Sequence, residues 1–190
     1  DIYLNLKNFA YNVIDYGAKG DGLTDDTKAI QDAIDDCYSN GGGTVIIPRG
    51  TYIIKAHDQN FTTGDSIHNA NHDYNGGLKL RTGVSLQGTN IGECILKAIA
   101  NSSESYRLIS VVECSNVKIS QLTLEGDYGD HLGTTGEWGH GVMVLHSSNV
   151  VLEDLVIRNM WGDGVYIGLL YNNLSSTQNN RIFVSRVNIN

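Results

Sequence analysis

Acidic, imidazole and indole side chains gather in one short segment of this 190-residue chain, GDYGDHLGTTGEWGH over 126–140. Hydrolysis of a glycosidic bond needs a proton donor to the leaving oxygen and a carboxylate that acts as base or nucleophile. Aromatic rings in the same place offer flat faces for sugar rings. The segment therefore predicts a carbohydrate site, and its candidate catalytic acids are Asp127, Asp130 and Glu137.

A short repeat links this segment to a second one. WGHGVMV at 138–144 recurs as WGDGVYI at 161–167, which is 23 residues later. If the two copies lie on neighbouring strands about 4.8 Å apart, His140 is next to Asp163. The repeat thus adds Asp163 as a catalytic acid and His140 as a residue that tunes an acid or binds substrate. The predicted sugar-stacking residues are Trp138, Trp161 and Tyr166.

A longer repeat predicts a second column of polar residues. SNVKISQLTLEG at 115–126 aligns with SNVVLEDLVIRN at 148–159 and with NRIFVSRVNIN at 180–190. The alignment places Glu125 beside Arg158, and an acid beside an arginine forms a charge-assisted pair. Arg158 and His131 complete the predicted substrate-binding set. The alternative is that polar strand ends simply repeat, with the loop carboxylates solvated and His140 hydrogen-bonded locally.

The repeats also predict the fold that must position these residues. Short apolar runs follow one another with only two or three residues between many of them, which is too short for a helical crossover. A turn of about 23 residues with three short strands, lengthened by insertions at 126–140 and 169–180, is typical of a parallel β-helix. The sequence therefore predicts an all-β solenoid.

One helix is predicted, over TDDTKAIQDAIDDCYS at 24–39. Thr24 is the expected N-cap, and Asn40 with the glycines that follow it ends the helix. The apolar residues form one face that must be covered: Ala29, Ile30, Ala33, Ile34 and Cys37.

The N-terminal part carries a family resemblance. NVIDYGAKGDGLTDDTKAIQDAI, followed by GGGTVIIPRGTYII, resembles the start of the pectate-lyase-like family of right-handed parallel β-helices. That family includes bacteriophage tailspike depolymerases, glycoside hydrolase family 28-related proteins and alginate epimerases. The likeness is close over 11–54, and the repeats extend it to the C-terminus. It implies one single-stranded right-handed β-helix domain over 1–190, with a first strand and capping helix at 11–43 and coils at 44–190. Because VNIN at 187–190 finishes inside a strand column with no capping element, the chain is expected to be part of a longer protein or an assembled protomer.

The resemblance also bears on the site. GHGV resembles the Gly-His-Gly element of polygalacturonase-type hydrolases, and WGDGV resembles their Gly-Asp-Asp element. The order of the two elements is reversed here, and Gly164 replaces the second aspartate. The tyrosine, aspartate and histidine pattern of the alginate epimerases is absent from GVYIG. No segment resembles the calcium and arginine constellation of pectate lyases.

Together these features predict a polysaccharide-degrading protein, a glycoside hydrolase of tailspike or secreted type. The alternatives are a polysaccharide lyase of the same fold and a non-catalytic, structural or carbohydrate-binding fibre module. Metals and cofactors are not predicted, and the expected location is extracellular, secreted or on a virion surface. The net charge of −8 argues against nucleic acid as a binding partner. The apolar runs are too short for a membrane span. A homotrimer is the expected assembly.

Overall fold

Parallel strands make up most of the computed structural model, which describes residues 10–57, 76–168 and 180–190. The helices are η1 (Val13–Tyr16), a 3₁₀ turn, and α1 (Thr27–Ser39). The strands are β1 (Ala10–Asn12), β2 (Asp21–Asp25), β3 (Gly43–Ile47), β4 (Gly50–Ile54), β5 (Leu78–Lys79), β6 (Val84–Gly88), β7 (Cys94–Ala98), β8 (Ser105–Val112), β9 (Ser115–Glu125), β10 (Trp138–Leu145), β11 (Ser148–Arg158), β12 (Val165–Gly168) and β13 (Asn180–Ile189).

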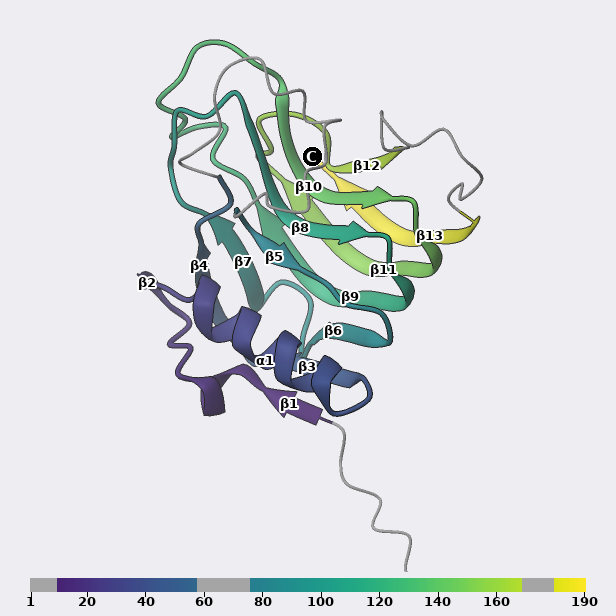
Figure 1. Ribbon diagram of the computed structural model, residues 1–190. Coiled ribbons are helices and arrows are strands. Elements are labelled where there is room, and N and C mark those ends of the chain that lie inside the picture. Colours follow the sequence, from purple (N-terminus) through teal and green to yellow (C-terminus); the bar gives the residue numbers. More distant parts are fainter. Residues whose placement is uncertain (1–9, 58–75, 169–179) are drawn as a thin grey trace, which may run out of the picture.

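The strands wind into stacked coils with three faces (Figure 1). The first half of β9 pairs with β6 and its second half pairs with β7, so the nine-stranded sheet forms two faces joined by long strands. The third face is the four-stranded sheet β12-β10-β8-β5. Every strand pairing between described residues is parallel, which confirms the predicted right-handed parallel β-helix class.

A single residue bends each long strand between the first two faces. Gln121, Asp154 and Arg186 have φ values of 59°, 52° and 50° and occupy equivalent places in β9, β11 and β13. A residue in the left-handed region turns the chain without an intervening loop. The paired apolar runs that the sequence suggests as separate strands are therefore continuous, bent strands.

The strand register explains the two repeat lengths. Val117 is in register with Val150, and Val150 with Ile182, which gives coils of 33 and 32 residues. Val142 is in register with Val165, only 23 residues later. The difference arises because the long insertion of one coil precedes β10, whereas in the next coil residues 169–179 follow β12.

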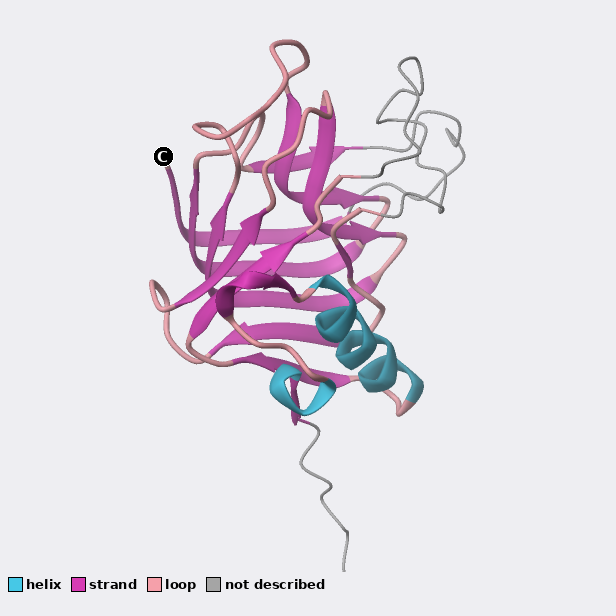
Figure 2. Ribbon diagram, turned by 90° about the vertical axis from the view of Figure 1, so that its left-hand side faces the viewer, coloured by secondary structure: helices cyan, strands magenta, loops and turns pink. Residues whose placement is uncertain are grey.

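The helix α1 covers the end of the stack that holds β1 and β3 (Figures 1 and 2). Its apolar face is buried as predicted, with Ile30, Ala33, Ile34 and Cys37 each 0% exposed. The predicted start at Thr24 is wrong, because residues Asp21–Asp25 form strand β2 and the helix begins at Thr27. None of the helices among the described residues is long and apolar enough to cross a membrane.

Candidate functional site

The coil register brings His140 and Asp163 together. Nδ1 of His140 lies 3.6 Å from Oδ2 of Asp163, as the WGHGV and WGDGV repeat predicts. The imidazole is 1% exposed and the carboxylate is 61% exposed. The pair therefore presents a solvent-facing acid with a buried histidine behind it.

Tyr166 joins this pair on the outer face of the third sheet. Its ring stacks on His140 with 5.1 Å between the ring centroids and 20° between the planes. Tyr166 also packs with Met143 and Leu145, which form an apolar cluster apart from the main core. The sequence-predicted residues His140, Asp163 and Tyr166 are thus neighbours.

The sequence prediction missed Arg107, which belongs to the same column. The β8–β10 register pairs Arg107 with His140, and side chains at paired positions project from the same face of a sheet. Arg107 is 3% exposed. Aligning the YR pair at 106–107 with the GH pair at 139–140 would have revealed it, but the sequences of β8 and β10 share little else.

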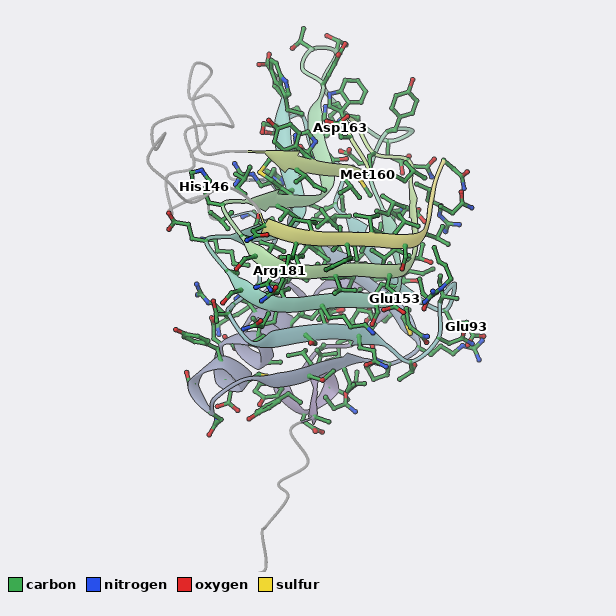
Figure 3. The ribbon with its side chains drawn as sticks, turned by 90° about the vertical axis from the view of Figure 1, so that its right-hand side faces the viewer. Glu93, His146, Glu153, Met160, Asp163 and Arg181 are labelled. Atoms are coloured by element: carbon green, nitrogen blue, oxygen red, sulfur yellow. The ribbon has the colours of Figure 1, made fainter. Side chains whose placement is uncertain are left out.

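A cleft of about 680 Å³ opens beside the column. One wall comes from the insertion between β9 and β10 and includes Tyr128 and Glu137; the other includes Trp161 and Asp163. Figure 3 shows Asp163 and Met160 at the same end of the coil stack, away from Glu93. Two of the predicted acids, Glu137 and Asp163, therefore line one cleft.

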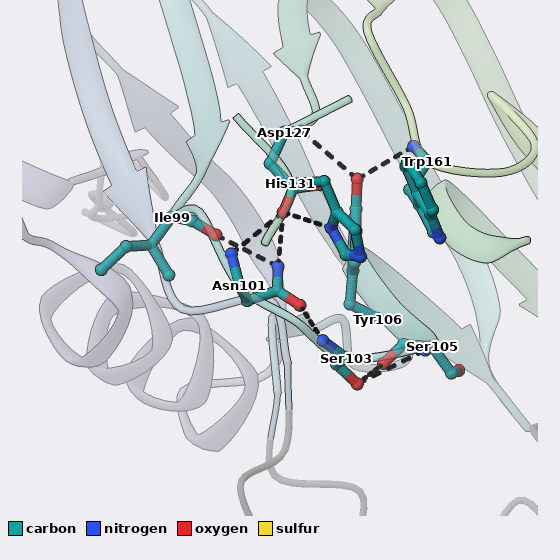
Figure 4. A network of polar contacts seen from close by, with 8 residues as sticks. All are labelled: Ile99, Asn101, Ser103, Ser105, Tyr106, Asp127, His131 and Trp161. Carbon is teal, nitrogen blue, oxygen red and sulfur yellow. Dashed lines mark hydrogen bonds and ion pairs between the residues drawn. The ribbon is translucent and has the colours of Figure 1, made fainter. Parts of the chain in front are cut away.

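Asp127, by contrast, lies buried beneath the insertion. Its Oδ2 accepts hydrogen bonds from the backbone N–H of Asn101 at 3.1 Å and from the side-chain amide of Asn101 at 2.9 Å. Nδ1 of His131 lies 2.9 Å from the same oxygen, and both side chains are 1% exposed (Figure 4). A carboxylate can only accept, so the His131 nitrogen donates when Asp127 is ionised. This geometry makes Asp127 and His131 an internal anchor for the insertion.

Tyr106 connects this anchor to the cleft. Its hydroxyl oxygen accepts the backbone N–H of Asp127 at 3.4 Å and that of Trp161 at 3.1 Å (Figure 4). Burial raises the pKa of Tyr106, so the phenol stays neutral at physiological pH. Tyr106, Asp127 and Trp161 lie in three successive coils. The hydroxyl oxygen of Tyr106 therefore links these coils through two hydrogen bonds.

The two tryptophans lie in different surroundings. The indole of Trp161 stacks on His131 with ring centroids 4.0 Å apart, and Tyr128 is tilted against it at 5.7 Å. Trp138 begins β10, where the residue is 45% exposed and its backbone N–H donates to the carbonyl of Glu104. The structure thus gives Trp161 the imidazole of His131 as its stacked partner.

The remaining predicted residues lie outside the cleft lining. Asp130 is exposed in the turn after Asp127. Arg158 donates from Nε and a terminal nitrogen to Oε2 of Glu125, at 3.0 and 2.7 Å, which confirms the predicted pair. Lys97 approaches the other Glu125 oxygen at 3.2 Å. Lys97, Glu125 and Arg158 are in register on β7, β9 and β11, so the guanidinium of Arg158 belongs to a ladder of ion pairs across these strands.

Comparison with known proteins places these features in a family. A family model described as rhamnogalacturonase A/epimerase, pectate lyase-like, matches residues 10–190. Mannuronan C5-epimerase AlgE3 of Azotobacter vinelandii is 37% identical over 161 residues, which cover 81% of this chain and 8% of that protein. Alginate lyase 7 of the same organism is 32% identical over 159 residues, covering 79% and 17%.

Among solved structures, the A-module of mannuronan C-5 epimerase AlgE6 from Azotobacter vinelandii is similar with a TM-score of 0.64 and 30% identity. The similarity covers 84% of this chain and 42% of that module. The chain therefore spans less than a fifth of these two curated relatives and less than half of the module.

Proposed function

Because this chain belongs to the rhamnogalacturonase A/epimerase, pectate lyase-like family, a group of polysaccharide-acting β-helices, we propose that it contributes the cleft of a polysaccharide-degrading glycoside hydrolase. The observation that carries the proposal is that Glu137 and Asp163 line one cleft. A hydrolase needs a proton donor and a second carboxylate flanking the same bond.

The surroundings of the two acids suggest their roles. Asp163 presents its carboxylate to solvent, and the buried imidazole of His140 lies 3.6 Å behind it. Asp163 is therefore the proposed base or nucleophile, and Glu137 is the proposed proton donor to the leaving oxygen. Trp161 and Tyr128 supply aromatic surfaces for the sugar rings on either side of the scissile bond.

A second candidate, a polysaccharide lyase, is favoured by the column of Arg107, His140 and Asp163. Elimination from a uronate needs a cation for the sugar carboxylate, a base for the proton next to it and an acid for the leaving oxygen. Arg107 supplies a cation, and His140 and Tyr166 are groups that can exchange protons. The names of the relatives, mannuronan epimerase and alginate lyase, add support for a uronate substrate.

The products of the reaction distinguish the candidates. The protein in its full natural length is incubated with mannuronan, polygalacturonate and a panel of neutral capsular polysaccharides. Hydrolysis releases reducing ends without ultraviolet absorbance from unsaturated sugars, whereas elimination produces both. Binding without either product would overturn the proposal of a degrading enzyme, and an unchanged sugar composition of the polymer would then favour a carbohydrate-binding fibre module.

The same proposal extends to location and assembly. A polysaccharide substrate fits an extracellular protein, secreted or on a virion surface, and a homotrimer is the proposed assembly. Light scattering of the purified protein measures the assembly directly, and a monomer at all concentrations would contradict it.

A further inference from the structure

Trp161 has different neighbours on its two sides. The imidazole of His131 is stacked against the indole, with 18° between the ring planes. The His131 side chain is 1% exposed and lies behind the cleft, whereas Trp161 itself lines it. Trp161 is therefore stacked on the buried His131 and also lines the cleft, where the tilted ring of Tyr128 lies 5.7 Å from it.

His131 is itself held in place. Its Nδ1 is bonded to Asp127, and the same Asp127 oxygen accepts two hydrogen bonds from Asn101 (Figure 4). The backbone of Trp161 is fixed separately through the hydroxyl of Tyr106. Tyr106 thus fixes the backbone of Trp161, and His131, which is bonded to Asp127, packs against its ring.

We propose that His131 is a positioning residue, which holds the indole of Trp161 as a stacking platform for one pyranose ring of the polysaccharide. A flat aromatic face binds the C–H face of a sugar through dispersion and burial of apolar area, and its orientation sets which ring face fits. The inference rests on the proposed function. It changes the predicted role of His131 from direct substrate contact to support of Trp161.

Two variants of His131 separate stacking from hydrogen bonding. His131→Phe keeps a ring against Trp161 but removes the donor to Asp127. His131→Asn keeps a donor but removes the ring. A positioning role predicts that His131→Asn raises KM about tenfold with kcat nearly unchanged, while His131→Phe raises KM by much less. A purely structural role predicts the reverse order, because only the asparagine can still bond Asp127.

A second readout needs no substrate. The chain has 2 tryptophans, so Trp138→Phe leaves Trp161 as the single reporter. In that background, His131→Asn should shift the emission to longer wavelength and increase quenching by acrylamide, whereas Leu132→Ala on the exposed side of the insertion should change neither.

The outcomes separate this inference from the proposed function. Unchanged emission in His131→Asn overturns the positioning role. A larger KM in His131→Phe than in His131→Asn, which is the order expected for hydrogen bonding alone, overturns it as well. If the wild-type protein neither binds nor cleaves any polysaccharide in the panel, the proposed function fails and the platform role fails with it. If it cleaves but Trp161→Ala leaves KM unchanged, only the platform role fails.

Discussion

His140 and Asp163 are one coil apart, and Nδ1 of the first lies 3.6 Å from Oδ2 of the second, yet only the carboxylate reaches solvent. The stacked backbone of β10 and the segment before β12 sets this distance, because Gly141 and Val142 donate hydrogen bonds to Asp163 and Gly164. The pair is thus a direct product of the coil register.

The two cleft acids should be required for catalysis. Asp163→Asn and Glu137→Gln are each expected to lower kcat by about 10²- to 10⁴-fold, since each removes one partner of the acid–base pair. Measured release of reducing ends from the best substrate gives the comparison. Glu93→Gln, which lies farther along the stack from Asp163 (Figure 3), is the matched control and should keep wild-type kcat. Full activity in both cleft variants would rule out the hydrolytic mechanism.

Asp127 should contribute to stability far more than its neighbour Asp130. Asp127→Ala leaves the amide groups of Asn101 and the ring nitrogen of His131 without their acceptor in a buried place, which costs about 3 kcal/mol of unfolding free energy. Asp130→Ala removes an exposed side chain and should stay within about 0.5 kcal/mol of wild type. Urea unfolding measures both, and equal effects would contradict the anchor role.

Two glycines of the insertion form a matched pair. A Cβ on Gly126 would lie 2.2 Å from the carbonyl oxygen of Asn159, whereas a Cβ on Gly129 would meet no atom within 4 Å. Gly126→Ala is therefore expected to cost about 2 kcal/mol through forced separation of the coils, and Gly129→Ala close to nothing. Thermal unfolding checks the difference. Indistinguishable melting temperatures would show that the coils are not packed this closely at the insertion.

The ladder around Glu125 predicts a pH dependence. Burial by itself would raise the pKa of Glu125, but the hydrogen bonds and charges of Arg158 and Lys97 outweigh it and hold the pKa below its ordinary value of 4.5. A carboxyl with a lowered pKa contributes stability that is present above pH 4.5 and is lost as the pH falls through the folded-state pKa.

Glu125→Gln removes that titration. The unfolding free energy of wild type should therefore exceed that of Glu125→Gln by a constant amount at neutral pH, and the difference should shrink as the pH falls below 4.5. Urea unfolding of the two proteins over a pH series measures it. A gap that widens in acid would reverse the predicted sign.

The sequence was sufficient for much of the fold because the repeats report strand register directly. The alignment of SNVKI with SNVVL predicts that Ser115 lies next to Ser148, and the structure has that pairing. The start of α1 was not predictable in the same way. Asp26 resembles a residue of the first helical turn, but its buried carboxylate accepts the N–H groups of Lys19 and Gly20 and holds the chain just before the helix.

The site was only partly predictable for a similar reason. His140 and Asp163 share a repeated motif, so the sequence shows that they are neighbours. Asn101 and Tyr106 share no motif with Asp127, and their contacts depend on how three coils turn at one corner. Nothing in the local sequence distinguishes such a buried anchor from a catalytic acid, so the sequence alone groups Asp127 with Glu137.

The hydroxyl of Tyr106 accepts two backbone N–H groups on the insertion side, those of Asp127 and Trp161. Backbone groups are present whatever side chain occupies a position. The exposed residues of the insertion and the ring at 161 can therefore vary through evolution while the corner keeps its shape, and a homologue with a different insertion could bind a different glycan on the same support. Substrate range in this architecture can change one loop at a time, without redesign of the coils.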